Sequence, residues 1–344
     1  MKRIAHLGMY FAALLGVILS TVLVVREGAG DIFGILLTAG WSLFWLVPFH
    51  LLPIGLDVMG WRRLLRDEPR AGFPFLLWVA GVRESVNGLL PVARVGGELV
   101  GVRLLARRGI AGDVAGASIV VEVTLTLVSQ FLFTLAGIAI LAHYVHDHVL
   151  IADTLVGLLI TLPAILAFIM LQHHWGLFQL LERVIRAILG RHSPWAGSDA
   201  MVRLDEAVRH IYRQRATLGI ALFWQLAGLF MGAVEVWFTF HLLHHPISPA
   251  LAVMLESLGQ ALRSATFVVP AGLGVQEGGF LLFGAGAGIS PEVALAFSLA
   301  RRFRELAFGI PFLLAWQSAE GHNLHRRWRA GRDGDNTLPG RGKS

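Results

Sequence analysis

No cysteine occurs among the 344 residues. Without thiols the chain cannot form disulfides, iron–sulfur clusters, thiolate metal sites or a cysteine nucleophile. Three motifs of energy-using or hydrolytic enzymes are also absent, namely G-x-x-x-x-G-K-[ST], H-E-x-x-H and G-x-S-x-G. We therefore expect a protein that does not hydrolyse nucleotide, is not an enzyme, and binds no metal or other cofactor.

Charged residues are scarce as well, at 15% of the chain, whereas soluble domains carry about 25%. Hydrophobic residues make up 55%, and the mean hydropathy is +0.65. Several apolar runs reach the roughly 20 residues that a helix needs to cross a bilayer, and the ten-residue alternation of barrel strands is missing. The sequence predicts an all-α, polytopic integral membrane protein.

The net charge of +6 and the pI near 10.6 do not indicate a nucleic-acid partner. The basic residues cluster beside apolar segments, as in residues 61–66 and 326–329. Such clusters are typical of the cytoplasmic flanks of membrane helices, where they also attract anionic lipid. We expect the lipid bilayer as a partner, and no nucleic acid.

A single membrane domain is expected over residues 1–319, with a basic, disordered cytoplasmic tail over 320–344. About six full transmembrane helices are predicted, the first of them retained rather than cleaved as a signal peptide; they span residues 7–25, 32–54, 113–142, 149–171, 217–243 and 292–316. Two broken or re-entrant helical hairpins are expected at 72–109 and 247–289, and cytoplasmic interfacial and polar helices at 175–215. The distribution of arginine places both termini in the cytoplasm of a bacterial inner membrane.

The two broken segments resemble each other. Ser85, Pro91 and Glu98 align with Ser264, Pro270 and Glu277 at an offset of 179, and residues 85–115 and 264–294 share 8 identities in 31. Three full spans separate the segments, so the second enters the membrane from the opposite face. The sequence therefore predicts an inverted repeat built from broken helices, an arrangement that places polar sites near the membrane midplane in many transporters.

The tips of both hairpins, at residues 87–91 and 269–274, combine proline with glycine, so their backbone groups need a partner, water or a ligand. Glu98 and Glu277 follow each proline by seven residues, and a carboxylate at that depth must be paired or must line a wet cavity. A purely structural ion pair is the alternative to a functional one. We expect the substrate to contact Arg83, Glu84, Asn87, Pro91, Arg94, Glu98, Arg263, Pro270, Gly272, Gly274, Gln276, Glu277 and Arg301.

Other ionisable residues lie inside apolar segments. Arg301 and Glu305 are four residues apart and Glu256 and Arg263 seven apart, so each pair shares a helix face. Glu122 and Glu235 have no basic residue on their own helix at that spacing, so each either pairs with an arginine of another helix or is protonated, and each could couple transport to an ion.

Histidines gather on the predicted outer side, at positions 143, 146, 148, 241, 244 and 245. The loops are short and no carboxylate motif accompanies them. We expect interfacial, pH-responsive histidines rather than a zinc site.

These motifs resemble the flippase-like transmembrane domain of lysylphosphatidylglycerol synthetases. The resemblance rests on residues 83–87, 90–91 and 96–98 and on residues 270–278, with Ala271 where relatives commonly have glycine. Residues 60–62, 130–134 and 300–302 look most like the hopanoid-associated branch of that family. The resemblance implies a membrane protein that moves lipid, and the lack of a following aminoacyl-transfer domain implies that lipid aminoacylation is not its task.

We therefore expect an inner-membrane transporter or flippase of an amphiphilic, hopanoid-type lipid, acting alongside lipid-biosynthesis or export proteins. The alternatives are a lipid-biosynthesis enzyme or assembly subunit that acts on a head group, and a passive membrane scaffold. A carboxylate and a histidine within proton-transfer reach in a closed pocket would favour catalysis.

Overall fold

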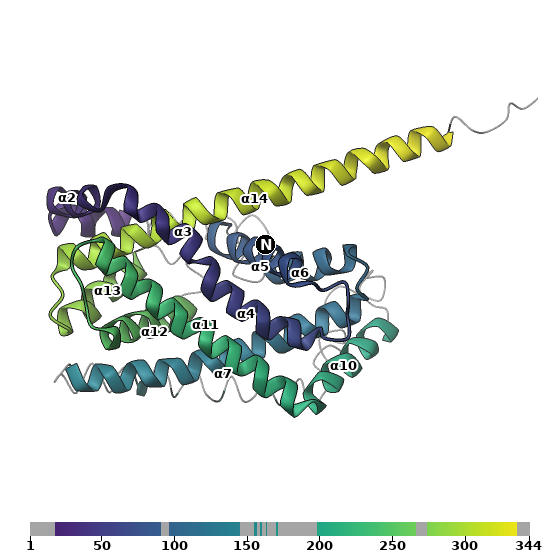
Figure 1. The fold of residues 1–344 in the computed structure, drawn as a ribbon, viewed down its shortest axis with the longest axis horizontal. Coiled ribbons are helices and arrows are strands. Elements are labelled where there is room, and N and C mark those ends of the chain that lie inside the picture. The colour runs from purple at the N-terminus through teal and green to yellow at the C-terminus, as the bar shows by residue number, and fades with distance from the viewer. Residues whose placement is uncertain are drawn as a thin grey trace, which may run out of the picture.

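In the computed structural model, every described secondary-structure element is a helix (Figure 1). The structure describes residues 18–90, 96–144, 198–265 and 274–335, together with five separate positions between 155 and 170. After a helical segment at 18–26, the elements are α2 (Ala29–Ala39), η1 (Gly40–Trp45), α3 (Leu46–Phe49), α4 (Leu51–Leu64), α5 (Phe73–Leu89), α6 (Gly96–Arg107), α7 (Gly112–Tyr144), α10 (Ser198–Arg213), α11 (Arg215–Leu242), α12 (Pro249–Ala265), α13 (Val275–Gly286) and α14 (Pro291–Asp335).

Three of the described helical stretches are long and apolar enough to cross a membrane: Ala29–Leu64, Gly112–Tyr144 and Arg215–Leu242. They correspond to three of the spans predicted from the sequence, although the first runs to Leu64 instead of ending near Ile54. Pro53 lies in the first turn of α4, where a missing N–H interrupts no helical hydrogen bond. The chain therefore continues past the prolines as a series of short helical pieces.

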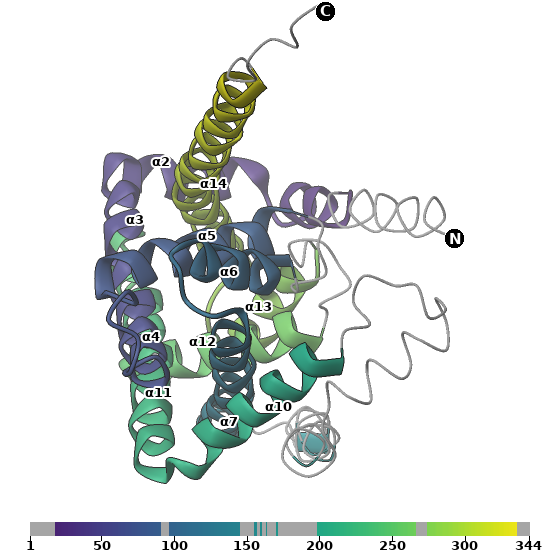
Figure 2. The same cartoon turned by 90° about the vertical axis from the view of Figure 1, so that its right-hand side faces the viewer.

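The long helices α7 and α14 lie along opposite edges of the molecule, and both views show the pairs α5–α6 and α12–α13 between them (Figures 1 and 2). The most extensive contact between helices joins α4 to α11. Buried apolar side chains form two clusters, one around α5, α6 and the first part of α7, and one around α12, α13 and the first part of α14. Each helical pair thus packs beside the start of the long helix that follows it.

The two helical pairs have the same dimensions. Each consists of a helix of 17 residues followed by one of 12 residues. Helices α6 and α13 begin at residues 96 and 275, and α7 and α14 begin at residues 112 and 291. Both differences equal 179, the offset at which the sequences align.

The corners that follow the short helices also match. Gly109 and Gly288 have positive φ angles of 89° and 76°. The N–H of the next residue donates back to the carbonyl five residues earlier, Ile110 to Leu105 and Ile289 to Gly284. This is the usual glycine-terminated end of a helix, and it turns both chains into the next helix in the same register.

The remaining predicted elements have mixed outcomes. Helix α10 lies within residues 175–215, where cytoplasmic interfacial and polar helices were predicted, and it packs on α7 through buried Val208 and Ile211. The predicted span at 149–171 lies almost entirely outside the described residues, and so does the first part of the 175–215 segment, up to residue 197. Helix α14 continues to Asp335, whereas the sequence predicted a disordered tail from residue 320.

Candidate functional site

The first charged cluster surrounds Arg83, whose side chain is only 9% exposed. Its Nη2 binds the carboxylate of Glu98 on α6 and lies 2.7 Å from Oε2 of Glu122 on α7. The guanidinium also stacks over the ring of Trp61, 4.7 Å from its centroid. One cation of α5 is therefore shared between two carboxylates from two other helices.

Small residues of α6 make room for this arrangement. A Cβ atom at Gly97 would lie 2.4 Å from the backbone oxygen of Arg83, and one at Gly101 would lie 2.8 Å from the Cδ of Arg83. The side-chain oxygen of Asn87 accepts a hydrogen bond of 2.8 Å from the N–H of Gly97 at the start of α6. The amide nitrogen of Asn87 donates to Glu98 over 3.2 Å. The hairpin thus holds Glu98 against Arg83 through close backbone approach.

A second cluster joins four helical segments around His50. Its Nε2 lies 2.8 Å from Glu84 on α5, and its Nδ1 lies 2.7 Å from Glu235 on α11. Arg304 of α14 donates a hydrogen bond of 2.6 Å to Glu235 and lies 2.5 Å from Nδ1 of His50. The side chain of Arg304 is 4% exposed. The side chains of His50, Glu235 and Arg304 are buried, and their burial is tolerable because a carboxylate faces each cation.

The third cluster lies around the second helical pair. Arg301 binds Glu256 of α12 through a buried ion pair. Arg302 donates to Glu277 over 3.3 Å, and Arg263 lies 3.3 Å from Glu305. Arg263 also donates to Gln276 over 3.3 Å, so α12, α13 and α14 are tied together by charge.

The structure brings most of the predicted site residues into these clusters. Arg83, Glu84, Asn87, Glu98 and Glu122 lie in or beside the first two, and Glu235 in the second. Glu122 and Glu235, for which the sequence left pairing and protonation open, each contact an arginine of another helix. Glu98 and Glu277 do so as well.

Glu98 and Glu277 bind different arginines and belong to different clusters. Gly274 caps the start of α13 with a φ of 78°. Four predicted site residues lie outside the described part of the chain: Pro91, Arg94, Pro270 and Gly272.

Sequence reasoning did not select His50 or Asp57 as site residues. His50 and Asp57 interrupt an apolar stretch, which was the available signal. Asp57 is half-buried at the contact between α4 and α11, where a Cβ atom at Gly228 would lie 2.2 Å from its Oδ1. The glycine at position 228 thus leaves space for the carboxyl group of Asp57.

No group of three or more metal-ligating side chains occurs within the described residues. Of the outer histidines, His143 stacks edge-on with Tyr144, and His241 packs against Trp237. His146 and His148 lie outside the described ranges. The zinc alternative therefore gains no support from the positions that are described.

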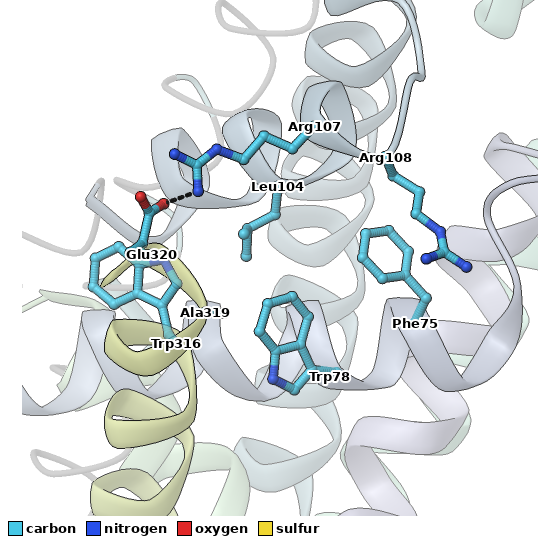
Figure 3. Close-up of a pocket in the computed structure, with 8 residues that line it drawn as sticks. All are labelled: Phe75, Trp78, Leu104, Arg107, Arg108, Trp316, Ala319 and Glu320. Atoms are coloured by element: carbon cyan, nitrogen blue, oxygen red, sulfur yellow. Dashed lines mark ion pairs between the residues drawn. The ribbon is translucent and has the colours of Figure 1, made fainter. Parts of the chain in front are cut away.

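A separate pocket of about 160 Å³ opens between α5, α6 and α14 (Figure 3). Trp78 and Trp316 line it with Leu104, and Arg107 closes one side through an ion pair of 2.5 Å with Glu320. Arg103 also donates to Glu320, over 3.2 Å. These contacts fasten the later part of α14 to the first helical pair.

Together, the clusters form a polar interior that draws on α4, α5, α6, α7, α11, α12, α13 and α14. Paired carboxylates and arginines in such an interior can bind a charged or zwitterionic head group, or can exchange a proton.

Comparison with known proteins gives one match. No curated protein and no solved structure matches the chain. The model of the family described as the lysylphosphatidylglycerol synthase TM region matches residues 10–312. This match relates the chain to membrane proteins of lipid head-group modification or flipping. On this match, and with three apolar helices of membrane-spanning length, the chain is a membrane protein that belongs to the lysylphosphatidylglycerol synthase TM-region family.

Proposed function

We propose that this protein is an inner-membrane transporter or flippase of an amphiphilic lipid. The head group binds among the charged clusters beside the two helical pairs, while the apolar part of the lipid stays in the bilayer. The observation that carries the proposal is the matched geometry of the two pairs. Each has a short second helix with a glutamate in its first turn, Glu98 or Glu277, held by an arginine of another helix.

The equal helix lengths and the matching glycine corners support an inverted repeat. In this proposal six full spans accompany two broken or re-entrant hairpins, and both termini face the cytoplasm. Transport follows from rocking of one half against the other, which alternately opens the charged interior to each leaflet.

The proposed substrate class is a hopanoid-type lipid, on the resemblance of residues 60–62, 130–134 and 300–302 to that branch of the family. The protein itself carries out no chemical step in this proposal. It works with the lipid-biosynthesis or export proteins that deliver or remove the lipid.

The test is identification of co-purified lipids by native mass spectrometry, followed by reconstitution into liposomes with a leaflet-specific assay of those lipids. Glu98→Gln and Glu277→Gln keep the shape of each side chain and remove its charge. We expect both variants to fold and to move lipid more slowly than the wild type. Gln317→Glu, on an exposed face of α14, is a control for charge changes in general. Wild-type rates in both Gln variants would show that these charges are structural.

One observation favours the alternative of an enzyme that acts on a lipid head group. His50 lies within hydrogen-bond distance of two carboxylates, so a histidine and a carboxylate are within proton-transfer reach of each other. A chemically altered lipid in the reconstituted vesicles, lost in His50→Gln, would identify this enzyme. Unaltered lipid that changes leaflet identifies the transporter.

A further inference from the structure

His50 lies in the first membrane-spanning stretch and is 9% exposed, with its ring edge-on to Phe308 at 5.1 Å. Charged groups gather around it. Glu84 on α5, Glu235 on α11 and Arg304 on α14 contact its ring. Beside these partners lie Arg83 on α5, Glu256 on α12, Arg301 and Glu305 on α14, and Asp57 on α4.

The Nδ1 atom of His50 has two rival partners. Oε2 of Glu235, 2.7 Å away, can only accept a hydrogen bond from it, and Nη1 of Arg304, 2.5 Å away, can only donate one to it. A ring nitrogen carries either a proton or a lone pair. Nδ1 therefore satisfies Glu235 when it is protonated and Arg304 when it is not.

The Nε2 atom has one close partner, because Nη1 of Arg304 lies farther from it, at 3.4 Å, than from Nδ1. It faces Oε1 of Glu84 at 2.8 Å, and this carboxylate accepts a hydrogen bond from the ring in both states. The neutral ring therefore carries its proton on Nε2, and the second proton enters and leaves at Nδ1.

The charge balance makes both states accessible. With a protonated ring, His50 and Arg304 supply two positive charges against the two negative charges of Glu84 and Glu235, and the cluster is neutral. With a neutral ring, one negative charge is in excess, but Nδ1 gains a hydrogen bond from Arg304. Histidine is the side chain suited to such an exchange near neutral pH.

We propose that His50 is the proton-binding group of this membrane interior and that its protonation moves Nδ1 from Arg304 on α14 to Glu235 on α11. The link to α5 through Glu84 persists in both states. Proton binding therefore changes which long helix is fastened to the segment around His50, as an ion-coupled transporter requires. The coupling role, but not the proton site, rests on the proposed function.

The proton site is tested by nitrogen-15 NMR of protein labelled at its histidine rings. The chain has 14 histidines, so the His50 signals are assigned by their loss in His50→Gln. As pH rises, we expect the His50 signals to change from those of a doubly protonated ring to those of a neutral ring that carries its proton on Nε2. A ring that keeps one state throughout the pH range of the folded protein, or a neutral ring protonated at Nδ1, overturns the proposal.

The coupling role is tested in liposomes under an imposed pH gradient. We expect wild-type lipid movement to respond to the gradient and His50→Gln to abolish the response. The control is His210→Gln, because His210 is exposed on α10, where its ring lies 3.0 Å from the side-chain amide of Gln214. A response retained in His50→Gln overturns the coupling role. Absence of any lipid movement in the wild type refutes the proposed function and leaves the NMR result intact.

Discussion

Removal of Arg83 should be among the most destabilising single changes in this protein. Its guanidinium is shared by Glu98 and Glu122, and the exposed side-chain fractions of the three residues are 9%, 24% and 13%. In Arg83→Gln, two largely buried carboxylates would face each other without a cation. Breaking a buried ion pair by removing one partner costs about 3–5 kcal/mol, because the remaining charge stays buried and uncompensated.

The same reasoning predicts a rescue. Adding Glu122→Gln to Arg83→Gln removes one of the two orphaned charges, so the double variant should recover a large share of the lost stability. The single change Glu122→Gln should cost less than Arg83→Gln, since Arg83 keeps Glu98 as its partner. The wild type, the two single variants and the double variant form a double-mutant cycle. Their free energies of unfolding are measured in mixed detergent micelles.

Arg103 provides the matched control. It pairs with Glu320 over 3.2 Å, but its side chain is 60% exposed. Exposed ion pairs contribute about 0–1 kcal/mol, so Arg103→Gln should barely change the free energy of unfolding. The reasoning would be refuted if Arg83→Gln were as mild as Arg103→Gln, or if the losses from Arg83→Gln and Glu122→Gln simply added.

Three further outcomes are expected. Gly97→Ala should destabilise the protein by about 1–3 kcal/mol in the same unfolding assay, because the new Cβ would lie 2.4 Å from the backbone oxygen of Arg83 on α5. Gly278→Ala is its control: a Cβ there meets no atom within 4 Å, so this change should be neutral or stabilising. Gly288→Ala also meets no atom within 4 Å, but its φ of 76° should cost about 1–2 kcal/mol; an effect equal to that of Gly278→Ala would contradict this. Single cysteines placed at Arg70 and His245 should react with an impermeant reagent from opposite faces of the membrane, and labelling from the same face would disprove the predicted topology.

Much of the helical framework could be predicted from the sequence. Apolar runs predicted the long helices that became α7 and α11, because a bilayer leaves backbone groups no partner other than those within a helix. The offset of 179 predicted equivalent segments, and the corners at Gly109 and Gly288 occupy equivalent positions. A glycine is required at each corner for a local reason, the positive φ angle, so it is visible in the sequence.

Helix bounds were less predictable where several weak signals competed. The second span was predicted to end at Ile54, but the helical stretch continues to Leu64. The glycine-rich, charged sequence after Glu320 indicated disorder, but α14 continues to Asp335. Local composition describes preferences of the isolated chain, and packing on a neighbouring helix can override them, as where α4 packs on α11.

The sequence by itself determined that each buried glutamate needs a cationic partner, a wet cavity or a proton, because an unpaired charge in a membrane interior is costly. Only the tertiary structure decided that they pair with arginines, and with which ones. Spacing placed Arg301 with Glu305 on one helix face and Glu256 with Arg263 on another. In the folded chain Arg301 binds Glu256 and Arg263 lies beside Glu305. Pairing between helices depends on how each helix is rotated and how the helices cross, and spacing along a single helix carries no information about either.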